Sequence, residues 1–281
     1  MNQMNFFAQV IEQIEEAAVQ IDKQTITGSR LALILIDNVI EILMYDLTKA
    51  ELSLEDYEMI IKGTFNDKFY DFKAKTKFLV NDEKISENQK EILNICHNFR
   101  NEAYHLNELR VGIISEIVKL YFQICCDITP KFFGHIPSNI ENNSIFSKYE
   151  ILGFNSLFSR GKLEELMKKF RAGREFDQKN FSKSLALDIE VRVKKVCGSM
   201  KEIQKVDTKN SFNHYESKLQ SFFRRANKLK SISNESNALK TYCKLDTDLV
   251  KIQLNIDLIR EYIDYETDLA IDRYREGDAF G

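Results

Sequence analysis

Residues 31–47 read LALILIDNVIEILMYDL, the most apolar stretch of the chain. The stretch is interrupted by Asp37, Glu41 and Asp46, and three carboxylates make burial in the hydrocarbon core of a membrane costly. We therefore expect a helix in the core of a folded domain and no membrane span. The helix is predicted to start near residue 27 or 29 and to end at Ala50.

The composition extends this helical prediction to the whole chain. Of 281 residues, only 2 are proline and 10 are glycine, fewer than the turns of an all-β or α/β chain of this length require. The 5 cysteines show no CxxC spacing, and the N-terminus does not resemble a signal peptide. We expect a cytoplasmic protein with reduced thiols, and we expect neither a metal site nor a cofactor.

Apolar residues at three- and four-residue steps predict helices on both sides of this stretch. Ser86 is the expected N-cap of a long helical stretch that breaks near residues 105–112. The fold class is all-α: an N-terminal helical bundle followed by a second helical region with a long C-terminal helix. The other predicted helices cover residues 5–21, 65–80, 88–127, 163–170, 212–230 and 237–275.

A domain boundary is predicted where the turn-forming residues gather. Pro130, Gly134 and Pro137 lie close together and are followed by a polar run. We therefore predict an N-terminal domain over residues 1–128, a linker over 129–145 and a helical C-terminal region over 146–281.

Two patterns in the C-terminal region concern helix pairing. Residues 185–193 alternate as a strand would, but their apolar positions also fit a helical stripe that continues to Ile203, and no partner strand is evident. Helix is therefore favoured. Between Leu245 and Ile263, apolar residues keep a heptad-like spacing, which predicts a paired helix, within the chain or between chains.

Charge is concentrated in the middle of the chain. Residues 160–230 contain 19 Lys and Arg against 9 Asp and Glu. Such a block is able to follow an RNA backbone, and Lys168, Lys169, Lys194 and Lys195 are the candidate contacts. The alternative is a lysine-rich helical surface that is simply solvated.

One motif contains candidate catalytic residues. Residues 95–105 read ICHNFRNEAYH, in which Arg100 and Asn101 precede His105. As a helix, this segment turns Cys96 and Phe99 toward the core, and His97, Asn101 and His105 toward the opposite side.

The motif resembles the Arg-polar-three-residues-His signature of the HEPN superfamily, small helical domains that include many ribonucleases of toxin and antiviral defence systems. The resemblance covers roughly residues 1–128. It implies that two copies of the motif meet in a homodimer, or in a higher homo-oligomer, and build one site that cleaves RNA without a metal. It assigns proton transfer to His105, the scissile phosphate to Arg100, and the orientation of His105 to Asn101.

Second-tier candidates are Glu102, Tyr104 and His97, of which His97 either contacts RNA or lies exposed. The main hypothesis is an endoribonuclease of toxin–antitoxin or antiphage defence, with RNA, and an antitoxin or a defence complex, as partners. One alternative is an inactive HEPN-like scaffold in a larger complex. The other is a helical RNA-binding module that acts through residues 160–230.

Overall fold

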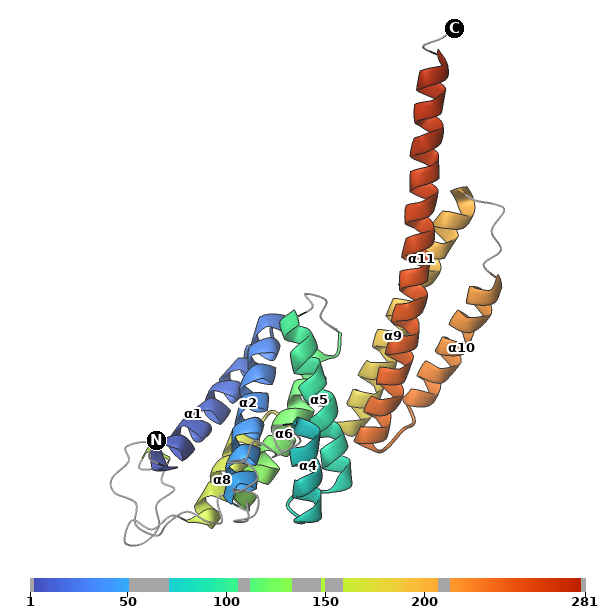
Figure 1. Ribbon diagram of the computed structural model, residues 1–281. Coiled ribbons are helices and arrows are strands. Elements are labelled where there is room, and N and C mark those ends of the chain that lie inside the picture. The colour runs from blue at the N-terminus through green and yellow to red at the C-terminus, as the bar shows by residue number, and fades with distance from the viewer. Residues whose placement is uncertain are drawn as a thin grey trace, which may run out of the picture. The chain divides into compact units, whose positions relative to one another are not determined.

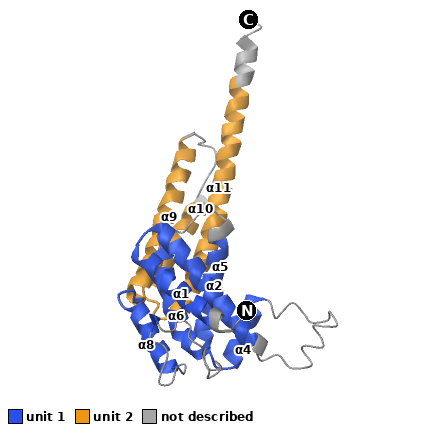
Figure 2. Ribbon diagram, turned by 90° about the vertical axis from the view of Figure 1, so that its left-hand side faces the viewer, with its two compact units in different colours: residues 1–177 blue, residues 178–281 orange. Residues whose placement is uncertain are grey.

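The computed structural model describes residues 3–50, 71–105, 112–132, 148–149, 159–206 and 213–278. All regular secondary structure in these residues is helical, which confirms the predicted all-α class (Figure 1). None of the helices described combines the length and the hydrophobicity needed to span a bilayer. The chain divides into two compact units, residues 1–177 and 178–281, coloured separately in Figure 2.

Unit 1 is organised around the apolar helix that the sequence singled out. This helix, α2, packs against α1, α4, α5 and α6, and Leu33, Ile36 and Ile40 are buried in the core that they share. Because α2 has neighbours on several sides, even its polar Asp37 is fully buried. The helices of unit 1 are α1 (Gln3–Asp22), α2 (Ile26–Ala50), α4 (Phe72–Asn81), α5 (Glu87–His105), α6 (Ile114–Phe132) and α8 (Arg160–Arg171).

The start of α5 follows the predicted cap. The Ser86 hydroxyl accepts a hydrogen bond from the backbone N–H of Gln89 at 3.2 Å, and the Gln89 side chain accepts one from the backbone N–H of Ser86 at 2.9 Å. This reciprocal capping box satisfies two backbone donors that a helix start otherwise leaves unpaired. Cys96 and Phe99 of α5 face the core as predicted. Helix α6 begins at Ile114, and residues 106–111 of the predicted break lie outside the described residues.

The observed division lies later in the chain than the predicted boundary at residue 128. Helix α6 continues through Pro130 to Phe132, and most of the predicted linker, residues 133–145, lies outside the described residues. Helix α8 packs on α1 and α6, held by ion pairs of Arg171 with Asp127 and of Arg174 with Asp22. Residues up to 177 therefore belong to the first unit.

None of the five cysteines, all of which the structure describes, takes part in a disulfide. Cys96, Cys125 and Cys126 are buried, and burial raises the pKa of Cys125 to about 12. A thiol with so high a pKa stays protonated and packs as a small apolar side chain.

Unit 2 consists of α9 (Gln178–Val206), α10 (Asn213–Leu229) and the long α11 (Glu235–Asp278), which all pack together. The stretch around residue 189 is helical. Its buried apolar residues are those of the predicted helical stripe. Leu187 and Val191 are exposed, whereas in a strand they would lie on the same face as these buried residues. The heptad-like residues from Leu245 to Ile256 are buried, so the predicted helix pairing occurs within the chain, between α9 and α11.

Candidate functional site

Helix α5 carries the motif residues, and the structure describes part of them. Arg100, Asn101 and Glu102 are half-buried. Tyr104 and His105 form the end of α5, and their side chains lie outside the described residues. The assigned role of His105 therefore remains a prediction, whereas the surroundings of Arg100 can be described in detail.

The centre of the site is Asp37, a residue from α2 that the sequence analysis treated only as a charge in an apolar helix. Its carboxylate is fully buried and is contacted by three side chains. His97 Nδ1 lies 3.1 Å from both carboxylate oxygens, Arg100 Nε lies 3.1 Å from Oδ2, and the Tyr121 hydroxyl donates to Oδ1 at 2.6 Å. A buried charge is tolerated when its partners satisfy it, as they do here.

Tyr121 enters this cluster from α6 and is itself fully buried. Burial, together with the negative charge of Asp37, raises the pKa of Tyr121 well above its ordinary value. The phenol therefore stays protonated and acts as a hydrogen-bond donor to the carboxylate.

His97 is held on two sides, which corrects the prediction that it points away from the protein. Its side chain is 16% exposed, and its ring stacks on Phe72 of α4 with the centroids 3.9 Å apart and the planes 10° from parallel. Since a carboxylate only accepts hydrogen bonds, the contact with Asp37 places the proton on Nδ1. Nε2 is then the ring nitrogen that accepts a proton, a tautomer fixed by a neighbouring carboxylate.

Arg100 is also anchored to the fold rather than directed outward. Its side chain is 23% exposed, and besides Asp37 it has a second carboxylate nearby, Glu41 Oε2, at 3.7 Å from Nη2. Asn101 accepts a hydrogen bond from Arg100 Nη1 at 2.9 Å, and its predicted role of orienting His105 remains a prediction. Arg100 and Asn101 thus form one unit whose geometry depends on α2.

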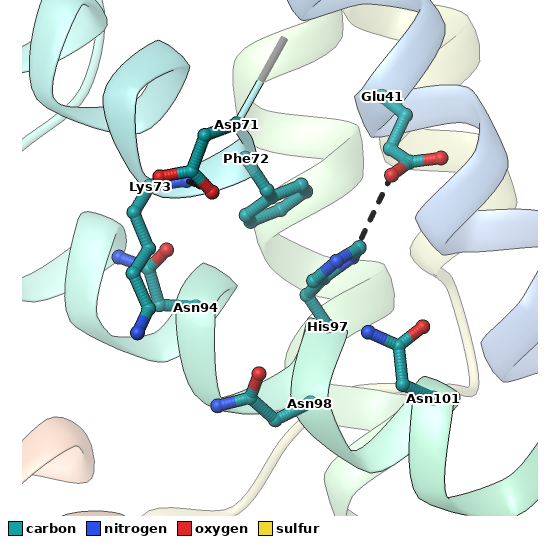
Figure 3. A pocket seen from close by; sticks show the side chains of 8 residues that line it. All are labelled: Glu41, Asp71, Phe72, Lys73, Asn94, His97, Asn98 and Asn101. Carbon is teal, nitrogen blue, oxygen red and sulfur yellow. Dashed lines mark hydrogen bonds and ion pairs between the residues drawn. The ribbon is translucent and has the colours of Figure 1, made fainter. Parts of the chain in front are cut away.

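A cavity of about 330 Å³ opens beside this cluster (Figure 3). Figure 3 shows the Phe72 and His97 rings face to face on one side and Glu41 across from His97. The lining combines an aromatic face, carboxylates, amides and one cation, and it comes from α2, α4, α5 and the N-cap of α4. The lining residues are Glu41, Asp71, Phe72, Lys73, Asn94, His97, Asn98 and Asn101.

Three groups of the kind that bind metal ions converge here, which the sequence analysis did not foresee. Asp37, Glu41 and His97 each offer a ligand atom, and these atoms all lie within 4.8 Å of one another. However, the Arg100 guanidinium already lies between the two carboxylates and neutralises part of their charge. A divalent cation would have to displace it, because two cations at such distances repel strongly away from bulk water.

The four candidate RNA-contacting lysines are all exposed, but they belong to different units. Lys168 and Lys169 lie on α8 in unit 1, and Lys194 and Lys195 lie on α9 in unit 2. The basic block of the sequence is therefore divided between two units, and each pair has to be considered separately.

Comparison of the chain with models of known protein families, with curated proteins and with solved structures found no match.

Proposed function

We propose that the chain is a metal-independent endoribonuclease of the HEPN type, with its reaction centre at the cavity beside α5. The observation that carries the proposal is the histidine His97, whose tautomer is fixed by the buried Asp37 and which lines a cavity next to Arg100 and Asn101. An imidazole oriented by a carboxylate is the usual arrangement of a general base.

In this reaction, His97 Nε2 accepts the proton of a ribose 2′-hydroxyl. The 2′-oxygen then attacks the adjacent phosphorus, and the bond from phosphorus to the 5′-oxygen breaks. A general acid protonates the departing 5′-oxygen, so that the products are a 2′,3′-cyclic phosphate and a 5′-hydroxyl. The HEPN resemblance offers His105, from the same or a second copy, as that acid.

The cavity lining supports a nucleotide of single-stranded RNA as the ligand. A cavity of about 330 Å³ lies within the range of small-ligand pockets. The exposed Lys73 is a cation for a phosphate, and the Asn98 amide provides both a donor and an acceptor for a base edge. Arg100 would stabilise the pentacoordinate phosphorus through Nη1 and Nη2, which would have to exchange their contacts with Asn101 and Glu41 for the phosphate oxygens.

The test is cleavage of single-stranded RNA by the purified full chain in EDTA. His97→Asn is the informative variant, because an asparagine amide replaces the Nδ1 donor toward Asp37 but provides no Nε2. We expect cleavage to fall by about 10²–10⁴-fold while the melting temperature changes little. His214→Ala, a histidine change on α10 of unit 2, is the matched control and should retain full activity.

Two results would contradict the proposal. Full activity of His97→Asn would show that His97 takes no part in the reaction. If His105→Ala were inactive at the same time, His105 would be the catalytic histidine. Activity that requires added magnesium or manganese would assign Asp37, Glu41 and His97 to a metal instead.

A second candidate function is an inactive HEPN-like scaffold. It is favoured by the anchoring of Arg100, which already has two carboxylates and Asn101 as partners and so has less charge to offer a phosphate. Absence of RNA cleavage in wild type under all conditions would favour this function. A role in toxin–antitoxin or antiphage defence, with an antitoxin as partner, belongs to the ribonuclease proposal and is tested by growth arrest on expression.

A further inference from the structure

Helix α11 carries a second apolar stripe that faces away from the buried heptad-like positions. Leu254, Leu258, Tyr262 and Tyr265 follow one another at four- and three-residue steps and are 56–63% exposed. Acidic residues, including the exposed Glu261 and Asp268, lie on the same side of the helix. We refer to these four apolar residues as the α11 stripe.

The stripe ends close to the point at which α11 begins to extend past its partner helix, α9. Arg260 of α11 pairs with Glu202 at 3.1 Å, and α9 ends one turn later, at Val206. Helix α11 continues to Asp278, so its last turns extend past α9 (Figure 1). Four exposed, large apolar side chains along one face of a helix are unusual unless another surface covers them.

Helix α9 offers a surface of complementary chemistry. Leu187 and Val191 lie one turn apart and are 58% and 56% exposed. Exposed lysines continue the same face in both directions, Lys183 one turn before Leu187 and Lys194 and Lys195 one turn after Val191. We refer to these five residues as the α9 patch.

We propose that the α11 stripe of one copy of the chain packs on the α9 patch of a second copy. The apolar residues of the two surfaces bury one another, and the acidic flank of the stripe meets the lysines of the patch. Around a two-fold axis the contact forms twice, so both surfaces of both copies are used and the assembly closes as a dimer. The contact lies in unit 2 and does not rest on the function proposed for unit 1.

Charge is the reason to choose a second copy as the occupant. Two α11 stripes facing each other would bring acidic flanks together, whereas stripe on patch pairs opposite charges. RNA would contact the lysines of the patch but would leave the α11 stripe and its acidic flank uncovered. The second copy is the occupant that accounts for both surfaces.

The experiment measures the mass of the full chain by light scattering over a series of protein concentrations at low and high salt. Glu261→Lys/Asp268→Lys and Lys194→Glu/Lys195→Glu should each raise the dimer dissociation constant by about tenfold or more. Lys218→Glu, an exposed charge reversal on α10, is the matched control and should leave it unchanged. Leu258→Lys, at an exposed position, should also weaken the dimer.

Combining both charge reversals in one chain restores opposite charges across the contact, so this variant should dimerise nearly as well as wild type. A wild type that stays monomeric at every concentration overturns the proposal, and so does a combined variant that fails to recover. Lys194→Glu/Lys195→Glu that weakens RNA binding without changing the mass would overturn it too, and would assign the α9 patch to nucleic acid.

Discussion

The two units contain similar buried ion-pair clusters, and the differences between them indicate which one has a function. In unit 2, Arg192 lies between Asp246, which is buried, and Asp188, which accepts a hydrogen bond from Tyr242 at 2.8 Å. In unit 1, Arg100 similarly lies between two carboxylates, Asp37 and Glu41. Each arginine thus joins two helices of its own unit.

The unit 1 cluster differs in that His97 joins it and a cavity opens beside it. A half-buried arginine that contacts two carboxylates is therefore not by itself a sign of catalysis in this protein, because the same arrangement in unit 2 holds α9 against α11. Such a cluster is weak evidence for either stability or function unless a reactive side chain, such as His97, also contacts it. The unit 2 cluster is therefore an internal control for the unit 1 cluster.

The largest effect is expected from removing the charge of the central aspartate. Asp37→Asn leaves Arg100 and His97 without a buried carboxylate, and we expect a loss of about 3 kcal/mol in the free energy of unfolding. Asp246→Asn should cost about as much, because it leaves Arg192 in the same position. Urea unfolding measures both losses.

The same two variants distinguish an effect on stability from an effect on RNA cleavage. RNA cleavage by the folded Asp37→Asn protein should fall at least about a hundredfold, because His97 loses the group that fixes its tautomer. Folded Asp246→Asn protein should cleave at the wild-type rate. Equal loss of cleavage in both variants would mean that the effect of Asp37 is only on stability.

A smaller effect is expected from the tyrosines. Tyr121→Phe removes a buried donor to a charged acceptor, and we expect it to lower the free energy of unfolding by about 1–2 kcal/mol at neutral pH. Tyr242→Phe in unit 2 should lower it by a similar amount. The pKa of Tyr121 is raised in the folded state. The contribution of its hydroxyl to the free energy of unfolding is therefore complete below about pH 10 and is lost as the pH rises above that value. The difference between wild type and Tyr121→Phe should therefore shrink in alkaline solution, and urea unfolding at neutral and alkaline pH measures it. A difference that grows with pH would contradict the assignment.

Helix positions could be predicted from the sequence because the spacing of apolar residues within one helix is a local property. The cap at Ser86 and the helix over the stretch around residue 189 followed from such spacing. The association of Asp37 with His97 could not be predicted, because the two are 60 residues apart and meet only through the packing of α2 on α5. The available signal was a pair of acidic residues one turn apart, Asp37 and Glu41, in an otherwise apolar helix.

The outward direction predicted for His97 was wrong for a related reason. A helical stripe identifies the side of α5 that faces the core, but it does not reveal that α2 and α4 also pack against this helix. The first compact unit extends beyond the predicted boundary, because prolines mark local breaks, whereas α8 packs on α1 and α6 through residues distant in the sequence.

The smallest effect is expected from the exposed lysines of the basic block. On α8, Lys168 and Lys169 each follow a glutamate by four residues, Glu164 and Glu165, and lie in the last turn of the helix. Both positions favour a cation, because i,i+4 pairs and the helix dipole each contribute a few tenths of a kcal/mol. We expect Lys168→Glu/Lys169→Glu to lower the free energy of unfolding by about 1 kcal/mol.

The unit 2 counterpart, Lys194→Glu/Lys195→Glu, lies in the middle of α9 and should change the free energy of unfolding of the monomer by less than about 0.5 kcal/mol. Because acidic residues one turn away already balance Lys168 and Lys169, we also expect that reversing them leaves the salt dependence of RNA binding unchanged. RNA affinity at two salt concentrations measures this. A decrease of about one unit in the log–log salt slope for each lysine reversed would instead show that α8 contacts the phosphate backbone, and it would add α8 to the RNA-binding surface of unit 1.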